Sequence, residues 1–340
     1  MKSFFGTLAA GAIALAAFAL PASAQTVLRV SNWLPPSHPI VKDIVLPWAA
    51  AVEEATDGRV TVQMLDAPLG PPPAHFDLAA TGAADVTFGV NGYTPGRFSL
   101  NQIAELPFLT PSSEALSVAY WRVYEKMLAE KDEYKGVKVL AVWGHGPGML
   151  FTTGAEVSPL SKLDGLKVRV AGKLTSMLAE QMKMVSVQAP SPKTYEVLSG
   201  GVADAIYFPY ESVPFFKLDS LLTKALRAEG GLYNVSFFMV MNQAKFDGLS
   251  DEDKAAIDGV SGEALVRIAG KAWDAADATG HDILESTVAF HDASEAEMEE
   301  LVAMSQPLYD AVAADYAAKG VDFDAALEML KAETAKVLQE

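Results

Sequence analysis

The stretch "DGLKVRVAG" (residues 164–172) decides the fold and opens the question of function. Its apolar residues alternate with Lys167 and Arg169, and a period of two is typical of a β-strand. The strand ends at Gly172. One face of this predicted strand is therefore apolar, while the other carries two positive charges.

Arg169 lies toward the carboxyl end of the predicted strand, whereas Lys167 lies nearer its start and can extend to solvent. Ligands of α/β proteins bind outside the carboxyl ends of the strands. A buried charge without a partner is very costly, so Arg169 requires an anion. That anion is either an internal acid such as Asp204 or an anionic ligand held by the guanidinium fork, whose geometry matches a carboxylate.

Strand and helix patterns alternate along the chain around this stretch, which predicts an α/β protein with a mainly parallel sheet. Helix breakers at 57–59 and at Gly82 and Gly200 separate the elements. After Ser250 the pattern becomes helical throughout, giving two α/β halves followed by a helical tail. Strands are predicted at 26–33, 60–65, 85–90, 136–143, 166–170, 185–190 and 202–208, and helices at 40–56, 76–81, 173–184, 193–199, 250–286, 294–317 and 323–339.

The first 24 residues have the composition of a secretory signal: Lys2, an apolar run, and the A-x-A cleavage site at 22–24. The apolar run is too short for a membrane span. We expect a mature chain that begins at Gln25, is exported to the periplasm and is a soluble monomer. No cofactor is expected.

The bulk composition excludes several classes of function. The chain has 340 residues, is 50 % apolar and carries a formal net charge of −17, which becomes −18 without Lys2. Such an acidic protein is expected to bind neither nucleic acid nor anionic lipid. It has no cysteine, so disulfides, thiolate metal sites and cysteine nucleophiles are excluded.

The histidines, His38, His75, His145, His281 and His291, show neither an HExxH motif nor paired metal-ligand spacing, so no metal site is expected. There is no GxSxG motif either, and we expect no enzymatic activity. The "GHGPG" run at 144–148 lacks the GxxxxGK[ST] pattern of a phosphate loop. It is either a simple turn or a hinge where the chain passes between its halves and approaches a ligand.

Aromatic residues gather after the predicted strand ends. The run "DAIYFPYESVPFF" (204–216) contains Tyr207, Phe208 and Tyr210, and Trp33 and Trp143 also lie at strand ends. Core packing explains some of these rings. Their concentration at strand ends predicts a pocket with aromatic walls.

Several segments together resemble one known family. The sequence is similar to the DctP-type extracytoplasmic solute receptors of tripartite ATP-independent periplasmic (TRAP) transporters over essentially its whole mature length. "LSKLDGLKVRVAG" (160–172) resembles the family segment L-x-G-L-K-[IV]-R-V-P-G, and "TYEVLSGGVADA" (194–205) resembles V-Y-x-A-L-x-x-G-V-V-D-G. "LRVSNWLPPSHP" (28–39), "VEEATDGRVTVQM" (52–64) and "ELPFL" (105–109) agree as well.

The resemblance implies a non-enzymatic, two-lobed periplasmic-binding-protein fold with a long helix spanning both lobes. Lobe I is expected from 25–148 plus about 237–275, and lobe II from 149–236 plus about 276–320. Residues 321–340 are expected to form the C-terminal helix. The lobes are expected to close around a small organic acid that is handed to the integral-membrane TRAP permease, with Arg169 pairing the ligand carboxylate.

Three departures from the family pattern shape the ligand prediction. Ala171 replaces the family proline, "GPGMLFTT" (146–153) lacks a second arginine, and Phe208 stands where many members have an asparagine. Two polar contacts are thereby replaced by apolar ones. We therefore expect a carboxylate with an apolar or aromatic body, while His38 or His145 holds any second polar group. The candidate ligand-binding residues are Arg169, Trp33, Asn32, His38, Asn91, Tyr93, Trp143, His145, Tyr207, Phe208, Tyr210 and Tyr233.

Two other classes of function remain open from the sequence. The chain is alternatively the receptor of an ABC-type importer, which would share the two-lobed fold. The second alternative is a secreted hydrolase with a histidine metal site. The metal content of the purified protein separates the second from a receptor.

Overall fold

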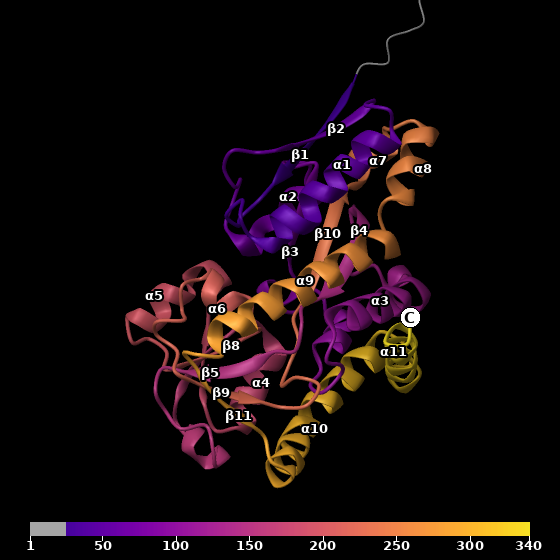
Figure 1. The fold of residues 1–340 in the computed structure, drawn as a ribbon. Coiled ribbons are helices and arrows are strands. Elements are labelled where there is room, and N and C mark those ends of the chain that lie inside the picture. The colour runs from indigo at the N-terminus through magenta and orange to yellow at the C-terminus, as the bar shows by residue number, and fades with distance from the viewer. Residues whose placement is uncertain (1–24) are drawn as a thin grey trace, which may run out of the picture.

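Two β-sheets organise the chain in the computed structural model, which describes residues 25–340 (Figure 1). The predicted signal segment, residues 1–24, lies outside the described residues. The first sheet has the order β2-β1-β3-β10-β4. Its strands are β1 (Thr26–Ser31), β2 (Val60–Met64), β3 (Val86–Val90), β4 (Val137–Gly144) and β10 (Ser236–Asn242).

The second sheet has the order β11-β9-β5-β8-β6-β7. It contains the strand predicted around Arg169, which the structure places as β6 between β7 and β8. Its strands are β5 (Met149–Thr152), β6 (Lys167–Val170), β7 (Val185–Gln188), β8 (Ala205–Phe208), β9 (Lys224–Arg227) and β11 (Ala289–Asp292).

The sheets are mainly parallel, as predicted, and each contains one strand that runs against the others. In the first sheet this strand is β10, antiparallel to both β3 and β4. In the second sheet it is β5, antiparallel to both β8 and β9. Each of these strands is the first one after the chain passes from one sheet to the other. Strand β5 follows β4 of the first sheet, and β10 follows β9 of the second.

Gly89 explains how β3 and β10 come together in the first sheet. A Cβ atom at Gly89 would lie 2.5 Å from the ring of Phe238, so only glycine lets this ring lie flat on β3. Phe238 is buried and contacts Phe76, Phe98 and Tyr134. The aromatic core of the first sheet depends on this close approach.

Helices cover both sheets. The predicted helix at 40–56 begins as a π-helical segment (Ile40–Val45) and continues as α1 (Leu46–Ala55), with Pro47 in the first turn of α1 where its missing N–H is tolerated. The other helices that precede the helical tail are α2 (His75–Ala80), α3 (Ser113–Val123), α4 (Lys173–Gln181), α5 (Thr194–Ser199), α6 (Ser212–Phe215) and α7 (Gln243–Asp247).

The helical region predicted from Ser250 divides into α8 (Asp251–Gly259) and α9 (Glu263–Leu284). The division falls at Gly262, whose φ of +60° is costly for other residues and where a Cβ atom would lie 3.2 Å from the Trp121 ring. Helix α9 packs on α3 and β4 at the first sheet and on α6 at the second, so it spans both lobes (Figure 1).

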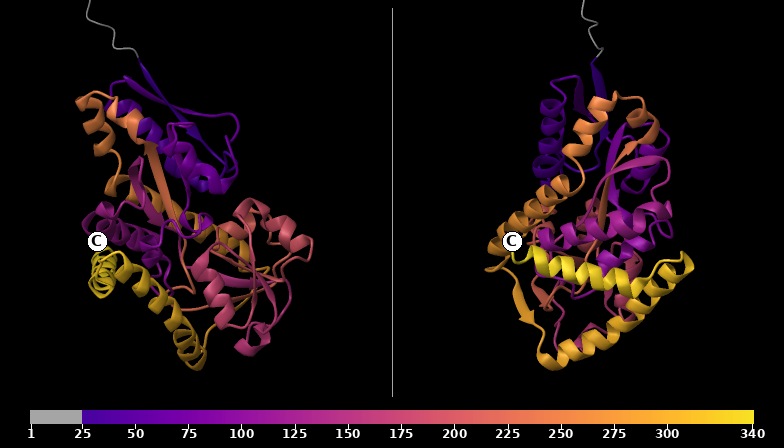
Figure 2. Two further views of the ribbon diagram at one scale, coloured as in Figure 1. Left: turned by 180° about the vertical axis from the view of Figure 1, so that it is seen from behind. Right: turned by 90° about the vertical axis from the view of Figure 1, so that its right-hand side faces the viewer.

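The tail consists of α10 (Glu295–Ala318) and α11 (Phe323–Val337). Ser294 caps α10 by accepting from the backbone N–H of Glu297, whose carboxylate accepts from Ser294 in return. Helix α10 packs against α4, and α11 returns to pack against α3. Figure 2 shows the two helices running along the outside of the molecule from the second sheet back to the first. Within residues 25–340 no helix is both long and apolar enough to cross a membrane.

Candidate ligand-binding site

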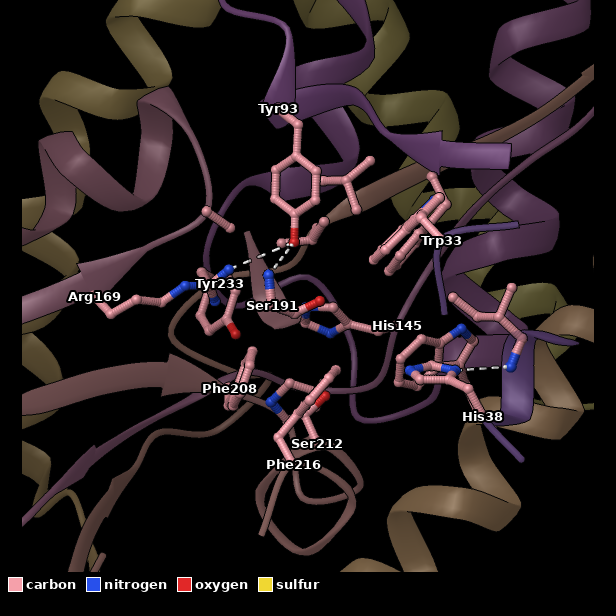
Figure 3. A pocket seen from close by; sticks show the side chains of 17 residues that line it. Trp33, His38, Tyr93, His145, Arg169, Ser191, Phe208, Ser212, Phe216 and Tyr233 are labelled. Carbon is pink, nitrogen blue, oxygen red and sulfur yellow. Dashed lines mark hydrogen bonds between the residues drawn. The ribbon is translucent and has the colours of Figure 1, made fainter. Parts of the chain in front are cut away.

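A small cavity lies between the two sheets and takes its walls from both (Figure 3). The volume of the cavity that the centre of a water-sized sphere can occupy is about 40 Å³. This is more than one water molecule requires. The residues that line it are Trp33, His38, Ile40, Val90, Tyr93, His145, Arg169, Ala171, Ser191, Phe208, Pro209, Ser212, Phe216, Tyr233, Val235, Phe237 and Trp273.

Arg169 reaches this cavity from β6 and is only 1 % exposed. Its Nε donates to the carbonyl of Ala189 at 2.7 Å, and its Nη2 lies 3.5 Å from the hydroxyl of Tyr93. The guanidinium carbon lies 4.9 Å from the centre of the Phe208 ring. Among residues 25–340 no carboxylate forms an ion pair with it. The guanidinium is therefore a buried positive charge that still lacks an anion.

The internal salt bridge to Asp204, which the sequence left open, does not form. The Asp204 carboxylate instead accepts from the backbone N–H of Lys167 at 3.1 Å. Lys167 itself is exposed, as expected from its place at the start of β6. The two basic residues of the opening stretch thus lie in opposite environments.

Tyr93 connects the first sheet to Arg169 across the cavity. It belongs to the turn Asn91–Tyr93 that follows β3, and its hydroxyl oxygen accepts from the backbone N–H of Ser191 at 2.8 Å. The same oxygen faces Arg169 Nη2. Because both contacts use the oxygen as acceptor, the hydroxyl hydrogen is free to be donated to a third group. Tyr93 and Arg169 together form a donor pair suited to one carboxylate.

The two halves also touch directly beside this pair. A Cβ atom at Gly172 would lie 3.0 Å from Gly92 Cα, and one at Gly92 would lie 3.0 Å from the Ala171 carbonyl oxygen. Gly172 is also the N-cap of α4, where the Thr175 hydroxyl accepts from its backbone N–H at 3.1 Å. The glycine that ends the opening stretch is therefore the N-cap of α4 and also permits the close approach of the halves.

Aromatic side chains form most of the remaining wall. Trp33 lies in it with its indole N–H donated to the Phe88 carbonyl at 3.0 Å, so its ring presents only carbon to the cavity. Phe208 and Phe216 stack at 5.7 Å on the opposite side. Phe237 from β10 completes the wall. These surfaces are suited to a flat apolar group.

His38 lies in the wall but both its nitrogens face protein groups. Its Nδ1 accepts from the backbone N–H of Ile40 at 3.1 Å, so the proton of the neutral ring is on Nε2, which lies 3.7 Å from Glu211 Oε1. Burial lowers the pKa of His38 to about 3 and raises the pKa of Glu211 to about 7. The ring is therefore neutral and takes part in packing.

His145 differs because one of its nitrogens is free. Its Nδ1 contacts the Gly146 carbonyl, while its Nε2 is buried without a hydrogen-bond partner among the described residues. Burial lowers its pKa to about 4, so this ring is also neutral. A buried acid lies next to Gly146: burial raises the pKa of Asp277 well above its usual value, and a Cβ atom at Gly146 would collide with Asp277 Oδ2. The contact of Nδ1 with the Gly146 carbonyl orients the His145 ring beside the cavity.

Asn32 and Asn91, both predicted to bind ligand, lie outside the cavity. The side chain of Asn32 accepts from the backbone N–H of Leu34 and donates to its carbonyl, which closes the turn before the helix. Asn91 donates to Ser236 and accepts from Tyr134 in the core. Each amide is already satisfied, so neither is available to a ligand in this structure.

Trp143, Tyr207 and Tyr210 also lie outside the lining. The Trp143 ring stacks on Phe237 at 5.5 Å and is covered by it. Tyr207 is 1 % exposed and places its hydroxyl on the sulfur of Met182. The Tyr210 hydroxyl accepts from Arg227 at the end of β9, at 3.3 Å. Tyr207 and Phe208 both belong to β8, where successive side chains point to opposite faces, so these neighbours in sequence separate.

The structure therefore brings together Arg169, Trp33, His38, Tyr93, His145, Phe208 and Tyr233 from the predicted set. The lining residues that the sequence did not single out are Ile40, Val90, Ala171, Ser191, Pro209, Ser212, Phe216, Val235, Phe237 and Trp273. Val235 and Phe237 were missed because β10 was not predicted. Phe216 lay in the aromatic run 204–216, and that density was a usable signal.

Comparison with known proteins identifies the family of this chain. Residues 30–315 match the family described as bacterial extracellular solute-binding protein, family 7, or DctP. The outer membrane transporter protein TsaT of Comamonas testosteroni is 31 % identical over 94 % of this chain and 96 % of its own.

Among solved structures, a TRAP periplasmic solute-binding protein from Bordetella bronchiseptica with bound (R)- and (S)-mandelate is 38 % identical, with a TM-score of 0.90 over 92 % of this chain and 99 % of that one. A TRAP solute-binding protein from Rhodoferax ferrireducens with copurified benzoate is 27 % identical, with a TM-score of 0.84 over 92 % and 98 %. This chain belongs to the DctP family of TRAP-type solute-binding proteins, a family of substrate-binding receptors and not of enzymes.

Proposed function

We propose that this DctP-family receptor captures an aromatic monocarboxylate in the periplasm and presents it to a TRAP permease. One observation carries the ligand class: Arg169, a buried guanidinium without a carboxylate partner in residues 25–340, opens on a cavity with mostly aromatic walls. The carboxylate takes the remaining Arg169 donors and the Tyr93 hydroxyl hydrogen. The ring of the ligand lies between the Trp33 and Phe208 sides.

A single carboxylate fits the charges of the wall. Arg169 is the only lysine or arginine among the residues that line the cavity, and both lining histidines are neutral. A second carboxylate would be buried without a cation, at a cost of several kcal/mol. This argument favours a monocarboxylate over the C4-dicarboxylates and sugar acids usual in the family.

The affinity requires the apolar walls as well as the arginine. A hydrogen bond to a charged group contributes about 1.5–3 kcal/mol net. A micromolar dissociation constant corresponds to about 8 kcal/mol. Burial of a ring must therefore supply much of the difference, at roughly 25 cal/mol per Å² of apolar surface.

Closure of two lobes is the proposed way in which the ligand is enclosed. We propose lobe I as 25–148 plus about 237–275 and lobe II as 149–236 plus about 276–320, with the 144–148 run as one hinge. The contacts of Tyr93 with Ser191 and of Gly92 with Gly172 then hold the closed form together. The closed form is the one that a membrane partner would recognise.

Export and partner follow from the family in this proposal. The segment at 1–24 acts as a cleaved signal, and the mature receptor works in the periplasm without catalysing a reaction. The neighbours with bound mandelate and benzoate are TRAP solute-binding proteins, which supports a TRAP permease as the partner over an ABC importer.

A calorimetric ligand series tests the proposal. Purified chain from residue 25 is titrated with benzoate, mandelate, succinate and glucuronate at one ionic strength, and native mass spectrometry records any ligand that copurifies. We expect low-micromolar or tighter binding of at least one aromatic acid and binding of succinate and glucuronate at least about 100-fold weaker. Tight capture of succinate or glucuronate with no response to either aromatic acid would contradict the proposal.

A further inference from the structure

Two fully buried polar atoms of the cavity residues have no partner among residues 25–340: His145 Nε2 and Trp273 Nε1. Both side chains are 3 % exposed. Figure 3 shows His145 facing the cavity across from Arg169. Buried polar atoms are nearly always hydrogen-bonded, and leaving one unpaired costs about 1–3 kcal/mol. These two atoms therefore point to a polar group that the protein itself does not supply.

The free nitrogen of His145 is a hydrogen-bond acceptor. Its Nδ1 contacts the Gly146 carbonyl oxygen, which can only accept, so the ring proton must be on Nδ1. Because burial keeps the pKa of His145 near 4, the ring carries no second proton at neutral pH. Nε2 is left with a lone pair that requires a donor.

The free nitrogen of Trp273 is a hydrogen-bond donor, because an indole N–H can only donate. Trp273 comes from α9, and its ring centroid lies 5.8 Å from that of His145. An unpaired acceptor and an unpaired donor thus occur on adjacent rings of the same wall. The complement of such a pair is a group that both donates and accepts.

Two other residues with similar chemistry do not join this pair. Both nitrogens of His38 are directed to the protein, to the Ile40 N–H and toward Glu211. The indole N–H of Trp143 is also unpaired, but the Trp143 ring lies behind Phe237 and does not line the cavity. Among the fully buried polar atoms of the wall, those without a partner are therefore confined to the His145–Trp273 corner.

We propose that the His145–Trp273 corner is a second subsite that selects a hydroxyl group on the body of the ligand, so that the preferred ligand is a ring-hydroxylated aromatic acid. The hydroxyl donates to His145 Nε2 and accepts from the Trp273 N–H. A carboxylate would place negative charge against the Nε2 lone pair, and an ammonium would leave the indole N–H unpaired. This inference rests on the proposed function, since it assumes that Arg169 takes the carboxylate.

The test compares benzoate with 3-hydroxybenzoate and 4-hydroxybenzoate by calorimetry on the full mature chain. At least one hydroxybenzoate should bind about 10-fold or more tightly than benzoate. In His145→Phe and Trp273→Phe this preference, measured as the ratio of the two affinities within each variant, should fall below about threefold. Trp143→Phe, which removes an unpaired indole N–H outside the cavity, should keep the full preference.

The outcomes separate this inference from the proposed function. Binding of none of the three acids contradicts the proposed function. Binding of all three with equal affinity, or a preference that survives in both variants, overturns the subsite alone. Should a variant not fold, nitrogen-15 spectra of wild type decide: the Nε2 resonance of one neutral histidine should shift with the hydroxybenzoate and not with benzoate. Equal spectra with both ligands overturn the subsite.

Discussion

Arg122 and Arg169 are both arginines held by secondary structure, and their surroundings are opposite. Arg122 on α3 donates to both carboxylate oxygens of Glu263 on α9, at 2.9 and 2.8 Å, and to Glu333 on α11 at 2.8 Å. Arg169 on β6 has one backbone carbonyl and one tyrosine hydroxyl. The less buried arginine has two acids, and the fully buried one has none among the described residues.

We propose that this difference separates an arginine that stabilises the fold from an arginine that binds a ligand. Arg122 joins three helices and its charge is balanced within the chain, so its removal should affect the fold. Arg169 carries a buried charge that no carboxylate in residues 25–340 balances, which supports the proposal that it binds an anionic ligand. Neither the exposure nor the sequence distinguishes Arg122 from Arg169. Their hydrogen-bond and ion-pair partners distinguish them.

Replacement of Arg169 should give the largest effect. We expect Arg169→Ala to weaken binding of an aromatic monocarboxylate at least about 100-fold, because the ligand charge would be buried without a cation. The thermal melting temperature without ligand should not fall. Arg169→Lys should not restore binding, since lysine lacks the guanidinium fork. An unchanged calorimetric affinity in Arg169→Ala would contradict the proposed difference between Arg122 and Arg169.

Removal of the Tyr93 hydroxyl should give a smaller loss. Tyr93→Phe deletes one donor to the ligand and the acceptor of Ser191 N–H, and we expect about 10-fold weaker binding, the equivalent of one hydrogen bond of about 1.4 kcal/mol. Tyr195→Phe serves as the control, because Tyr195 is exposed and does not line the cavity. Equal affinities of Tyr93→Phe and wild type would show that the Tyr93 proton is not given to the ligand.

Glu211 extends the comparison to a buried charge that can be lost by protonation, which an arginine cannot do. Burial raises the folded-state pKa of Glu211 to about 7, above its usual value near 4.3. The folded state therefore binds the extra proton between these values. The stabilisation of the folded state by this bound proton is fully present below about pH 4.3 and is lost as the pH rises through about 7.

The corresponding variant is Glu211→Gln, which resembles the protonated form at every pH. We expect it to melt close to wild type at pH 5 and several degrees above it at pH 8. Asp277 is present in both proteins, so its own titration largely cancels in the difference. Glu180→Gln on the exposed surface is the control and should show a constant offset. A pH-independent difference for Glu211→Gln would contradict a neutral, buried Glu211.

Replacement of Arg122 should have the smallest effect and of the opposite kind. Arg122→Ala removes partly exposed ion pairs, worth at most about 1 kcal/mol, which lowers the melting temperature by no more than about 2 °C for a protein of this size. Ligand affinity should stay within about twofold. If Arg122→Ala weakened binding as Arg169→Ala does, the division into structural and ligand-binding arginines would be wrong.

The sequence was informative wherever one residue type has few structural uses. The alternation in 164–172 predicted β6 and placed Arg169 at its carboxyl end, and Ser294 with Glu297 marked the start of α10. Strands β5, β9, β10 and β11 were not predicted. They are short or, like β10, buried on both faces, so they lack the alternation that marks a half-buried strand.

The site was predictable in its charge and less so in its walls. Arg169 was identified because a charge on a buried strand demands a partner. Trp273 was missed because it lies on the apolar face of a long amphipathic helix, where a tryptophan is typical of core packing. Only the structure shows that this helix passes beside the cavity. Trp143 was assigned to the cavity because it follows a strand end, but the ring of Phe237 covers it.

The coupling between Arg169 and the ligand charge is the most direct test of the central claim. Benzoate and its neutral isostere benzamide are titrated into wild type and Arg169→Gln by calorimetry, so that the four affinities give one coupling free energy. We predict that wild type prefers benzoate by at least about 100-fold and that Arg169→Gln prefers it by less than about threefold. A preference for benzoate that is equal in the two proteins would contradict the assignment of Arg169 as the group that binds the carboxylate.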